Sequence, residues 1–111
     1  MKINKDLVAA SATPIILSIL RDGESYGYAI IQRVRELSDG ELVWTDGMLY
    51  PILHRLEDQG LIEARWGESE TGRKRKYYRI QNSANEVLDA ERRQWNLVNL
   101  ILARLAQPEV A

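Results

Sequence analysis

The chain of 111 residues contains no cysteine and a single histidine. Without cysteine it can form neither a disulfide framework nor a thiolate metal site, and His54 alone is too few ligands for a transition metal. We therefore expect no metal and no cofactor. The absence of cysteine also suits a reducing cytoplasm, which is the compartment we predict.

Long apolar runs are missing as well, since none approaches the ~20 residues that cross a bilayer. Residues 2–20 superficially resemble a signal peptide, but Ser11, Thr13 and Pro14 interrupt the apolar stretch. The segment 21–23, Arg-Asp-Gly, then stands where a small-residue cleavage site would be needed. The sequence predicts neither secretion nor contact with a membrane.

An overall excess of positive charge is also absent, because the formal net charge is -1. Charge is instead segregated along the chain. Residues 61–81 hold six Arg or Lys and three Glu, a net +3, which leaves -4 for the remainder. A run of like charges is most often a solvated face, yet four consecutive cations at 73–76 repel one another and are better tolerated where a polyanion meets them.

The first 40 residues carry two helical patterns. Apolar residues recur at helical spacing from Lys5 to Arg21, and Pro14 should kink this helix or restart it with Thr13 as the cap. Ser25 is predicted to open a second helix, whose end lies just before Gly40.

A third helix is predicted over residues 48–59. Thr45 or Asp46 can accept hydrogen bonds from its first free amides, Gly60 ends it, and Pro51 must lie near the first turn to avoid breaking the ladder. Helical geometry directs Met48, Tyr50, His54, Arg55 and Asp58 outward.

Two strands joined by a polar turn follow this helix. Residues 62–66 alternate between apolar and charged side chains, with the period of a half-buried strand. Tyr78 and Ile80 supply the matching apolar side of the return strand, and Gly67 and Gly72 bracket the turn.

Helices followed by a basic hairpin make a winged helix, a fold that points to double-stranded DNA. The same parts can also be a mere packing unit, but the charge placement favours DNA. The predicted DNA-binding residues are Met48, Tyr50, Pro51, His54 and Arg55 on the third helix and Arg73, Lys74, Arg75 and Lys76 at the hairpin. The helix residues can meet base edges and the hairpin cations can neutralise phosphates, although His54 is first of all an exposed polar residue of its helix. We predict a mainly α fold, with a winged helix-turn-helix domain over residues 1–81.

Residues 82–111 are predicted to form a C-terminal dimerisation helix. It begins with a capping-box pattern at 83–86 and runs to about Pro108. Apolar residues spaced by about seven make a seam, and residues 97–105 are apolar over more than one face. The helix could bury this apolar surface against the core of its own subunit, but we expect a second copy of the chain to cover it. The predicted seam consists of Leu88, Trp95, Val98, Leu102 and Leu105.

Two other classes of function were weighed against DNA binding. A helical dimer could use its basic hairpin to bind an acidic protein, and this interaction module is the alternative to a DNA-binding regulator. Catalysis is not expected, because Glu57, Asp58 and Glu63 have no nucleophile or glycine-rich phosphate loop nearby.

These segments together closely resemble the PadR family of bacterial transcriptional regulators. The resemblance is carried by Glu-Ser-Tyr-Gly-Tyr at 24–28, Gly-Met-Leu-Tyr-Pro at 47–51, Arg-Leu-Glu at 55–57, Gly-Leu at 60–61, Trp66, and Gly-Arg-Lys-Arg-Lys-Tyr-Tyr at 72–78. It implies a homodimeric repressor of a near-palindromic operator, with two winged-helix heads. The subunit interface would be formed by the terminal and N-terminal helices, as in the short subfamily.

The chain departs from the family pattern at two places. Met48 stands where many members have threonine, which removes a hydroxyl that could cap the helix or touch DNA. Residues 80–84 replace the usual Leu-Thr-x-x-Gly, so the next helix cap is expected at Asn82 or Ser83. Trp95 matches a tryptophan that stacks on flat aromatic compounds at the dimer centre of the multidrug-sensing branch, which implies a planar aromatic effector.

Overall fold

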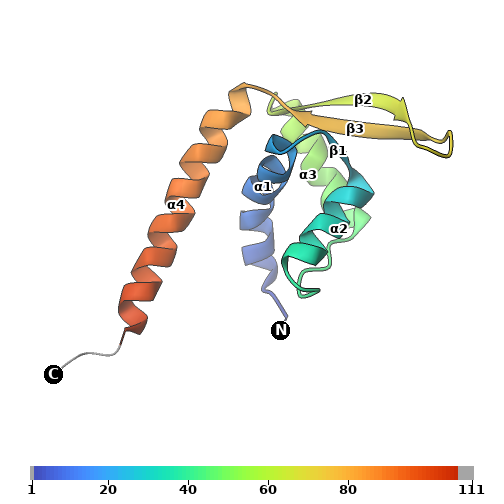
Figure 1. Ribbon diagram of the computed structural model, residues 1–111. Coiled ribbons are helices and arrows are strands. Elements are labelled where there is room, and N and C mark those ends of the chain that lie inside the picture. Colours follow the sequence, from blue (N-terminus) through green and yellow to red (C-terminus); the bar gives the residue numbers. More distant parts are fainter. Residues whose placement is uncertain (1, 108–111) are drawn as a thin grey trace.

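The computed structural model describes residues 2–107, which form four helices and three strands. In chain order these are α1 (Lys5–Arg21), β1 (Ser25–Tyr26), α2 (Gly27–Leu37), α3 (Asp46–Asp58), β2 (Ile62–Glu68), β3 (Lys74–Ile80) and α4 (Ser83–Ala106). Figure 1 shows α1, α2 and α3 gathered beneath the sheet, the β2–β3 hairpin extending to one side and α4 reaching away on the other. The predicted fold class is confirmed, while the predicted helix end at Pro108 lies outside the described residues.

The core is built by the three N-terminal helices and closed by the sheet and the start of α4. Ile16 of α1, Ile30 of α2, Leu53 of α3, Tyr78 of β3 and Leu88 of α4 are all fully buried in one cluster. Leu88 was predicted to belong to the dimer seam, and the structure corrects this. It packs inside its own subunit because the first turns of α4 lie against α1, so it has no surface to offer a partner.

Helix α1 is continuous through Pro14 and does not restart at Thr13. The Asn4 side chain caps it by accepting a hydrogen bond of 2.8 Å from the Asp6 amide. Pro14 is buried, and its carbonyl accepts a hydrogen bond of 2.6 Å from the Ser18 hydroxyl. Packing of the buried face outweighs the one ladder bond that proline removes.

Ser25 does not cap a helix. With Tyr26 it forms the short strand β1, which pairs antiparallel with β3 in the order β1-β3-β2, and α2 begins only at Gly27. A local capping signal is overridden here because the free edge of β3 offers backbone hydrogen bonds to the passing chain.

Helix α3 follows the sequence signals at both ends. Thr45 caps it, its hydroxyl accepting from the Met48 amide at 3.3 Å, and Gly60 ends it at a φ of 73°. Gly60 is in the left-handed region that glycine tolerates without strain. Pro51 was predicted near the first turn but is the sixth helical residue, in the second turn. The helix persists there because Leu49 and Leu53 on either side are completely buried.

The hairpin extends further than the alternation predicted. Gly67, predicted to flank the turn, lies within β2. Ala64 faces the buried Tyr78 across the ladder, but the next residue on that side, Trp66, is 68% exposed. Its predicted half-burial was wrong, because α3 and the core end beneath Tyr78 and leave the outer hairpin without a covering layer.

Helix α4 starts after Asn82, as expected, but without a capping box. Ser83 is the first helical residue, and its hydroxyl donates to the Gly60 carbonyl at 2.9 Å, so it links α4 to the end of α3. Within residues 2–107, no helix has the length and apolar character required to cross a membrane.

Candidate nucleic-acid interface

A groove of about 470 Å³ runs between α3, the hairpin and the start of α2. It joins the two parts of the molecule that the sequence analysis singled out, the outer face of the third helix and the basic strand. Its walls hold aromatic and basic side chains, and within the described residues none of its walls carries a carboxylate. The lining residues are Tyr26, Gly27, Tyr28, Tyr50, His54, Trp66, Lys74, Arg75, Lys76 and Tyr78.

On the α3 side, Tyr50 and the exposed His54 are one helical turn apart and both line the groove. The Tyr50 hydroxyl lies so close to Gly27 that a Cβ added there would overlap it. Glycine at position 27 therefore allows the ring to lie across the start of α2. Pro51 is exposed beside Tyr50 but is outside the groove.

Two other α3 residues predicted to face outward do not join this groove. Met48 is half-buried and packs against the core, on a side that it shares with Trp44 and Val8. Arg55 is exposed, but its guanidinium donates to the Thr13 hydroxyl of α1 at 3.2 Å. Helical rotation separates these residues from Tyr50 and His54, a difference that the count of outward positions did not resolve.

The four consecutive cations do not share one face. Because side chains alternate along a strand, Lys74 and Lys76 lie on the side of Trp66, while Arg75 lies on the other. The Arg75 guanidinium stacks 3.8 Å from the centre of the Tyr26 ring. Arg73 precedes β3 in the exposed turn. The predicted cationic run is thus split between the two faces of the strand, although Arg75, stacked on Tyr26, still contributes to the groove lining.

The opposite face of the sheet carries a ladder of polar and aromatic contacts that the sequence patterns do not predict. Arg65 donates to Glu24, with Nε 2.8 Å from Oε2, and its guanidinium lies 4.8 Å from the Tyr77 ring centre. Tyr77 in turn meets Tyr26 edge to face at 5.7 Å. The hydrogen bond from Arg65 holds the pKa of Glu24 below its usual value. This ladder braces the hairpin against β1. It joins Glu24 and Tyr26 to residues 41 or more positions later in the chain, so no local sequence pattern predicts it.

The same bracing continues at the base of the hairpin. Glu63 accepts hydrogen bonds from Gln81 and from Arg79, and these two contacts lower the pKa of Glu63. On the groove side, Lys76 forms an ion pair of 3.7 Å with Glu57 of α3. The hairpin is therefore tied to α3 on the groove side by Lys76 and to the β1 region on the opposite face by Arg65 and Tyr77.

Tyr78 closes the floor of the groove. Its side chain is completely buried, and within the described residues its hydroxyl has no hydrogen-bond partner. Burial raises the pKa of Tyr78 to about 12, so the phenol stays neutral at physiological pH. The Lys76 ammonium lies 5.6 Å above its ring, which places the cation at the surface of the groove.

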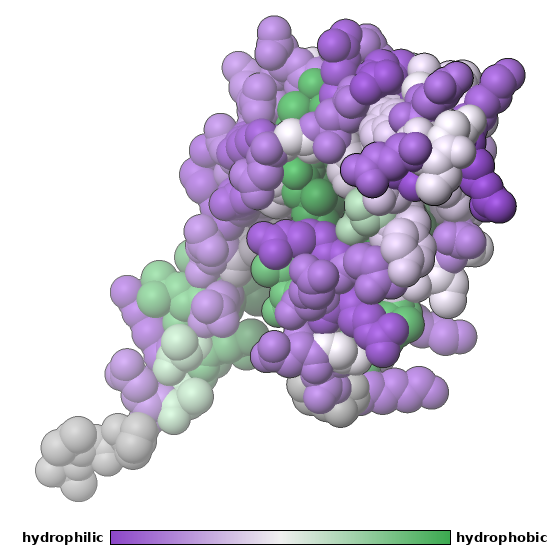
Figure 2. Space-filling view, turned by 45° about the vertical axis from the view of Figure 1, so that its right-hand side comes forward, coloured by the Kyte–Doolittle hydropathy of each residue, from purple (hydrophilic) through white to green (hydrophobic). Residues whose placement is uncertain are grey.

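A second surface lies at the far end of the molecule. Figure 2 shows apolar residues gathered along the outer part of α4, next to a largely hydrophilic body. The exposed apolar residues of this surface are Leu97, Val98, Leu100, Ile101, Leu102 and Leu105. Of the predicted seam, Val98, Leu102 and Leu105 are exposed here, and Trp95 is half-buried where α4 leaves the body.

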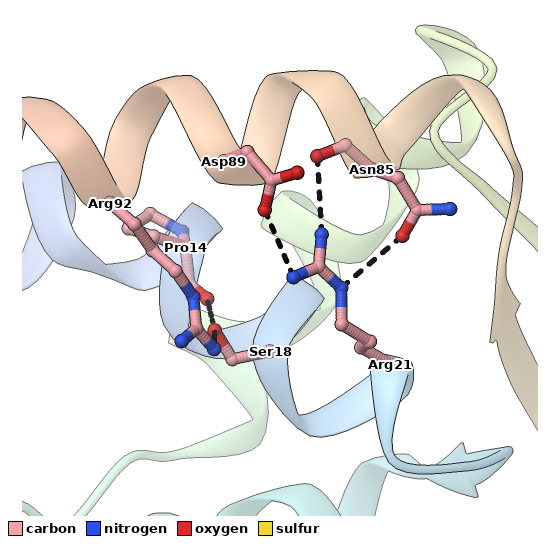
Figure 3. A network of polar contacts seen from close by, with 6 residues as sticks. All are labelled: Pro14, Ser18, Arg21, Asn85, Asp89 and Arg92. Atoms are coloured by element: carbon pink, nitrogen blue, oxygen red, sulfur yellow. Dashed lines mark hydrogen bonds and ion pairs between the residues drawn. The ribbon is translucent and has the colours of Figure 1, made fainter.

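The inner part of α4 is fixed to α1 by arginines, as Figure 3 shows. Arg21 donates to the Asn85 side chain at 3.2 Å and to the Asn85 carbonyl at 3.1 Å, and pairs with Asp89 at 3.1 Å. One turn further, Arg92 donates to the Ser18 hydroxyl at 2.8 Å. These bonds set the direction in which α4 extends away from α1 and the winged-helix domain.

This network borders an open groove of about 480 Å³ between α1, the end of α2 and α4, and Ser18, Arg21 and Arg92 are part of its lining. Trp95 lines it together with Pro14, Ile19 and Leu37, and Arg92 lies at its edge. An indole beside aliphatic side chains makes a wall suited to flat apolar molecules.

These features define a winged helix-turn-helix protein: three helices are followed by a β-hairpin, and a groove lined by cations lies between the third helix and the hairpin. Comparison with known proteins agrees with this class. Residues 16–90 match the profile of the transcriptional regulator PadR-like family. The chain belongs to this family of transcriptional regulators.

Solved structures of similar proteins support the assignment. A transcriptional regulator from Clostridium thermocellum is 30% identical and superposes with a TM-score of 0.82, over 93% of this chain and 100% of that one. A PadR-like transcriptional regulator from Bacillus cereus is 28% identical with a TM-score of 0.81, over 95% and 100% of the two chains. The Escherichia coli transcriptional regulator YqjI is 38% identical over 60 residues, which is 54% of this chain and 28% of that protein.

Proposed function

We propose that the protein is a homodimeric transcriptional repressor that binds a near-palindromic operator in double-stranded DNA. The observation that carries the proposal is the groove that Tyr50 and His54 of α3 share with Lys74 and Lys76 of β3. A helix beside a cationic strand matches the two parts of a DNA site, the base edges in the major groove and the phosphates beside them. A regulator that acts on bacterial DNA works in the cytoplasm.

In this proposal Tyr50 and His54 read bases, while Arg73, Lys74 and Lys76 neutralise phosphates. Pro51 lies on the same exposed turn of α3. Three other predicted residues contribute less to DNA binding in this proposal, because each has a contact within the subunit. Met48 packs on the core, Arg55 donates to Thr13 and Arg75 stacks on Tyr26.

A second copy of the chain covers the outer part of α4. Leu97, Val98, Ile101, Leu102 and Leu105 lie within an arc of about 140° on the helix, as follows from 100° per residue. An apolar stripe of this width, whose side chains are exposed in the single subunit, fits an antiparallel or crossed partner helix. A twofold dimer would present two heads to successive major grooves, about one helical turn apart.

The test is binding to DNA from upstream of the protein's own gene, followed by fluorescence anisotropy at several salt concentrations. If the dimer neutralises roughly 6 to 10 phosphates, affinity falls by about 10³ to 10⁵ between 50 and 200 mM salt. Salt-independent binding would contradict the electrostatic part. Binding to acidic proteins with no binding to any duplex would favour the interaction module instead.

Control by a planar aromatic effector is the finer part of the proposal. The support is the half-buried Trp95 in the groove between α1 and α4, next to the arginine network that directs α4. A flat molecule wedged there would change the angle of α4 and hence the spacing of the two heads.

Effector binding can be tested without DNA by titrating an acridine while tryptophan fluorescence is recorded. Quenching is expected in the wild type and should be lost in Trp95→Ala, over a background from Trp44 and Trp66. Full quenching in Trp95→Ala would exclude this site.

A further inference from the structure

Trp66 is the large side chain of the hairpin that the fold leaves uncovered. It is 68% exposed, whereas Trp44 is 4% exposed and Trp95 is half-buried. The exposed Trp66 indole does not pack in the core, because the buried part of the sheet ends at Ala64 and Tyr78. Its position therefore calls for an explanation outside the subunit's own packing.

The neighbours of Trp66 indicate what would cover it. Trp66 is directly opposite Lys76 in the ladder, and Lys74 is two residues nearer the hairpin tip on the same face. Lys74 and Lys76 are thus about 7 Å apart along the strand, with the indole beside them. Of the described strand residues on this face, Glu68, opposite Lys74, carries a carboxylate, and Glu57 of α3 pairs with Lys76.

This order of chemistry fits a nucleic-acid strand better than an apolar partner. A DNA strand alternates charged phosphates with apolar deoxyribose, and cations flanking a flat ring match that alternation. An apolar protein partner would have to bury the Lys74 ammonium, and the Lys76 ammonium with its ion pair to Glu57, which is unfavourable. The opposite wall of the groove, formed by Tyr28, Tyr50 and His54, is aromatic and adds no negative charge.

Resting on the proposed function, we propose that Trp66 is a DNA-contacting residue. Its ring packs on the deoxyribose of the strand whose phosphates Lys74 and Lys76 bind. The contact removes the indole from water and involves no ion pair, so it adds affinity for any duplex. It does not select a base sequence and releases no counterions.

The experiment compares wild type, Trp66→Ala, Trp66→Phe and Lys74→Ala on a mixed-sequence duplex of about 30 base pairs, long enough for two half-sites. Affinity is measured from low to moderate salt. Trp66→Ala should weaken binding about tenfold at every salt concentration with an unchanged salt slope, and Trp66→Phe should restore most of the loss. Lys74→Ala should reduce the slope by about 1. Val43→Ala, an exposed apolar truncation outside the groove, should change neither quantity.

A direct readout comes from acrylamide, a neutral quencher that leaves ionic strength unchanged. The exposed Trp66 should dominate quenching of the free protein, and duplex DNA should protect it. In Trp66→Phe the protection should disappear. Equal quenching with and without DNA, or wild-type affinity of Trp66→Ala, would overturn the inference while leaving the salt-dependent binding of the proposed function intact. If the wild-type protein binds no duplex, both the proposed DNA-binding function and the Trp66 contact are contradicted.

Discussion

Glu57 of α3 and Lys76 of β3 form an ion pair of 3.7 Å, in which Lys76 lines the groove and Glu57 does not. The pair connects the helix that we propose to read bases with the strand that we propose to bind phosphate. It also holds a carboxylate close to the position of the expected polyanion. Lys76 must exchange this partner, at least in part, when DNA is bound.

Replacing Glu57 with glutamine should therefore strengthen DNA binding. The change frees Lys76 and removes a charge that repels phosphate, so affinity at low salt should rise by roughly threefold, in keeping with a partly exposed pair. Asp58→Asn removes the neighbouring exposed carboxylate, which is not the one paired with Lys76, and it serves as the control. If anisotropy titrations show the same gain in DNA affinity for both variants, the change in net charge alone explains the gain.

Lys74 and Arg75 are adjacent, but replacing them should affect different properties, DNA binding for Lys74 and folding stability for Arg75. Lys74→Ala should lower DNA affinity and reduce the salt slope by about 1, with little change in stability. Arg75→Ala removes the stack on Tyr26 and should cost about 0.5–1 kcal/mol of unfolding free energy, with a smaller effect on the slope. Urea unfolding and salt-dependent binding of both variants separate the two roles, and identical behaviour would mean that the strand faces are not distinct.

Leu102 should be required for self-association. It is 61% exposed on the outer part of α4, and a glutamate there would place a charge in the proposed helix pair. Leu102→Glu should shift the protein from dimer to monomer in light scattering after size exclusion. Val43→Glu, at a site that is 58% exposed in the loop before α3, should leave the mass unchanged. A wild-type monomer at micromolar concentration would contradict the interface itself.

The Glu24–Arg65 contact should give the hairpin a pH-dependent stability. Its hydrogen bond lowers the folded-state pKa of Glu24 below the ordinary 4.5. The stabilisation is thus present above that value and is lost as the pH falls through the folded-state pKa. Glu24→Gln should lower the melting temperature at neutral pH, and the difference from wild type should shrink in acid. Arg65→Gln should behave similarly, and the double variant should add little, because the two residues act as one pair.

Much of the architecture was predictable because its signals are local. Thr45 and Gly60 delimit α3, since a cap and a left-handed glycine act within a few residues. The acidic body and basic hairpin were also evident from composition. The prediction was wrong where a distant segment competes with a local preference: β3 draws Ser25 into a strand, and Gly60 receives the Ser83 hydroxyl.

The candidate site was predictable as a region but not as a set of contacts. Sequence spacing placed Tyr50, His54 and Lys74 in the DNA-binding set, and they do line one groove. It could not show that Arg55 bonds to α1, because that depends on how α1 and α3 pack. Nor could it show that Leu88 is core, since a heptad pattern has the same appearance whether its partner is α1 or another chain.

The sequence by itself determined the helices, the hairpin, the position of the cations and the family, because periodicity, capping and charge are properties of neighbouring residues. Tertiary structure alone decided which side each cation occupies, which α4 residues remain exposed and how Arg21 directs that helix. Those outcomes depend on contacts between residues tens of positions apart, whose geometry is fixed only when the common core closes.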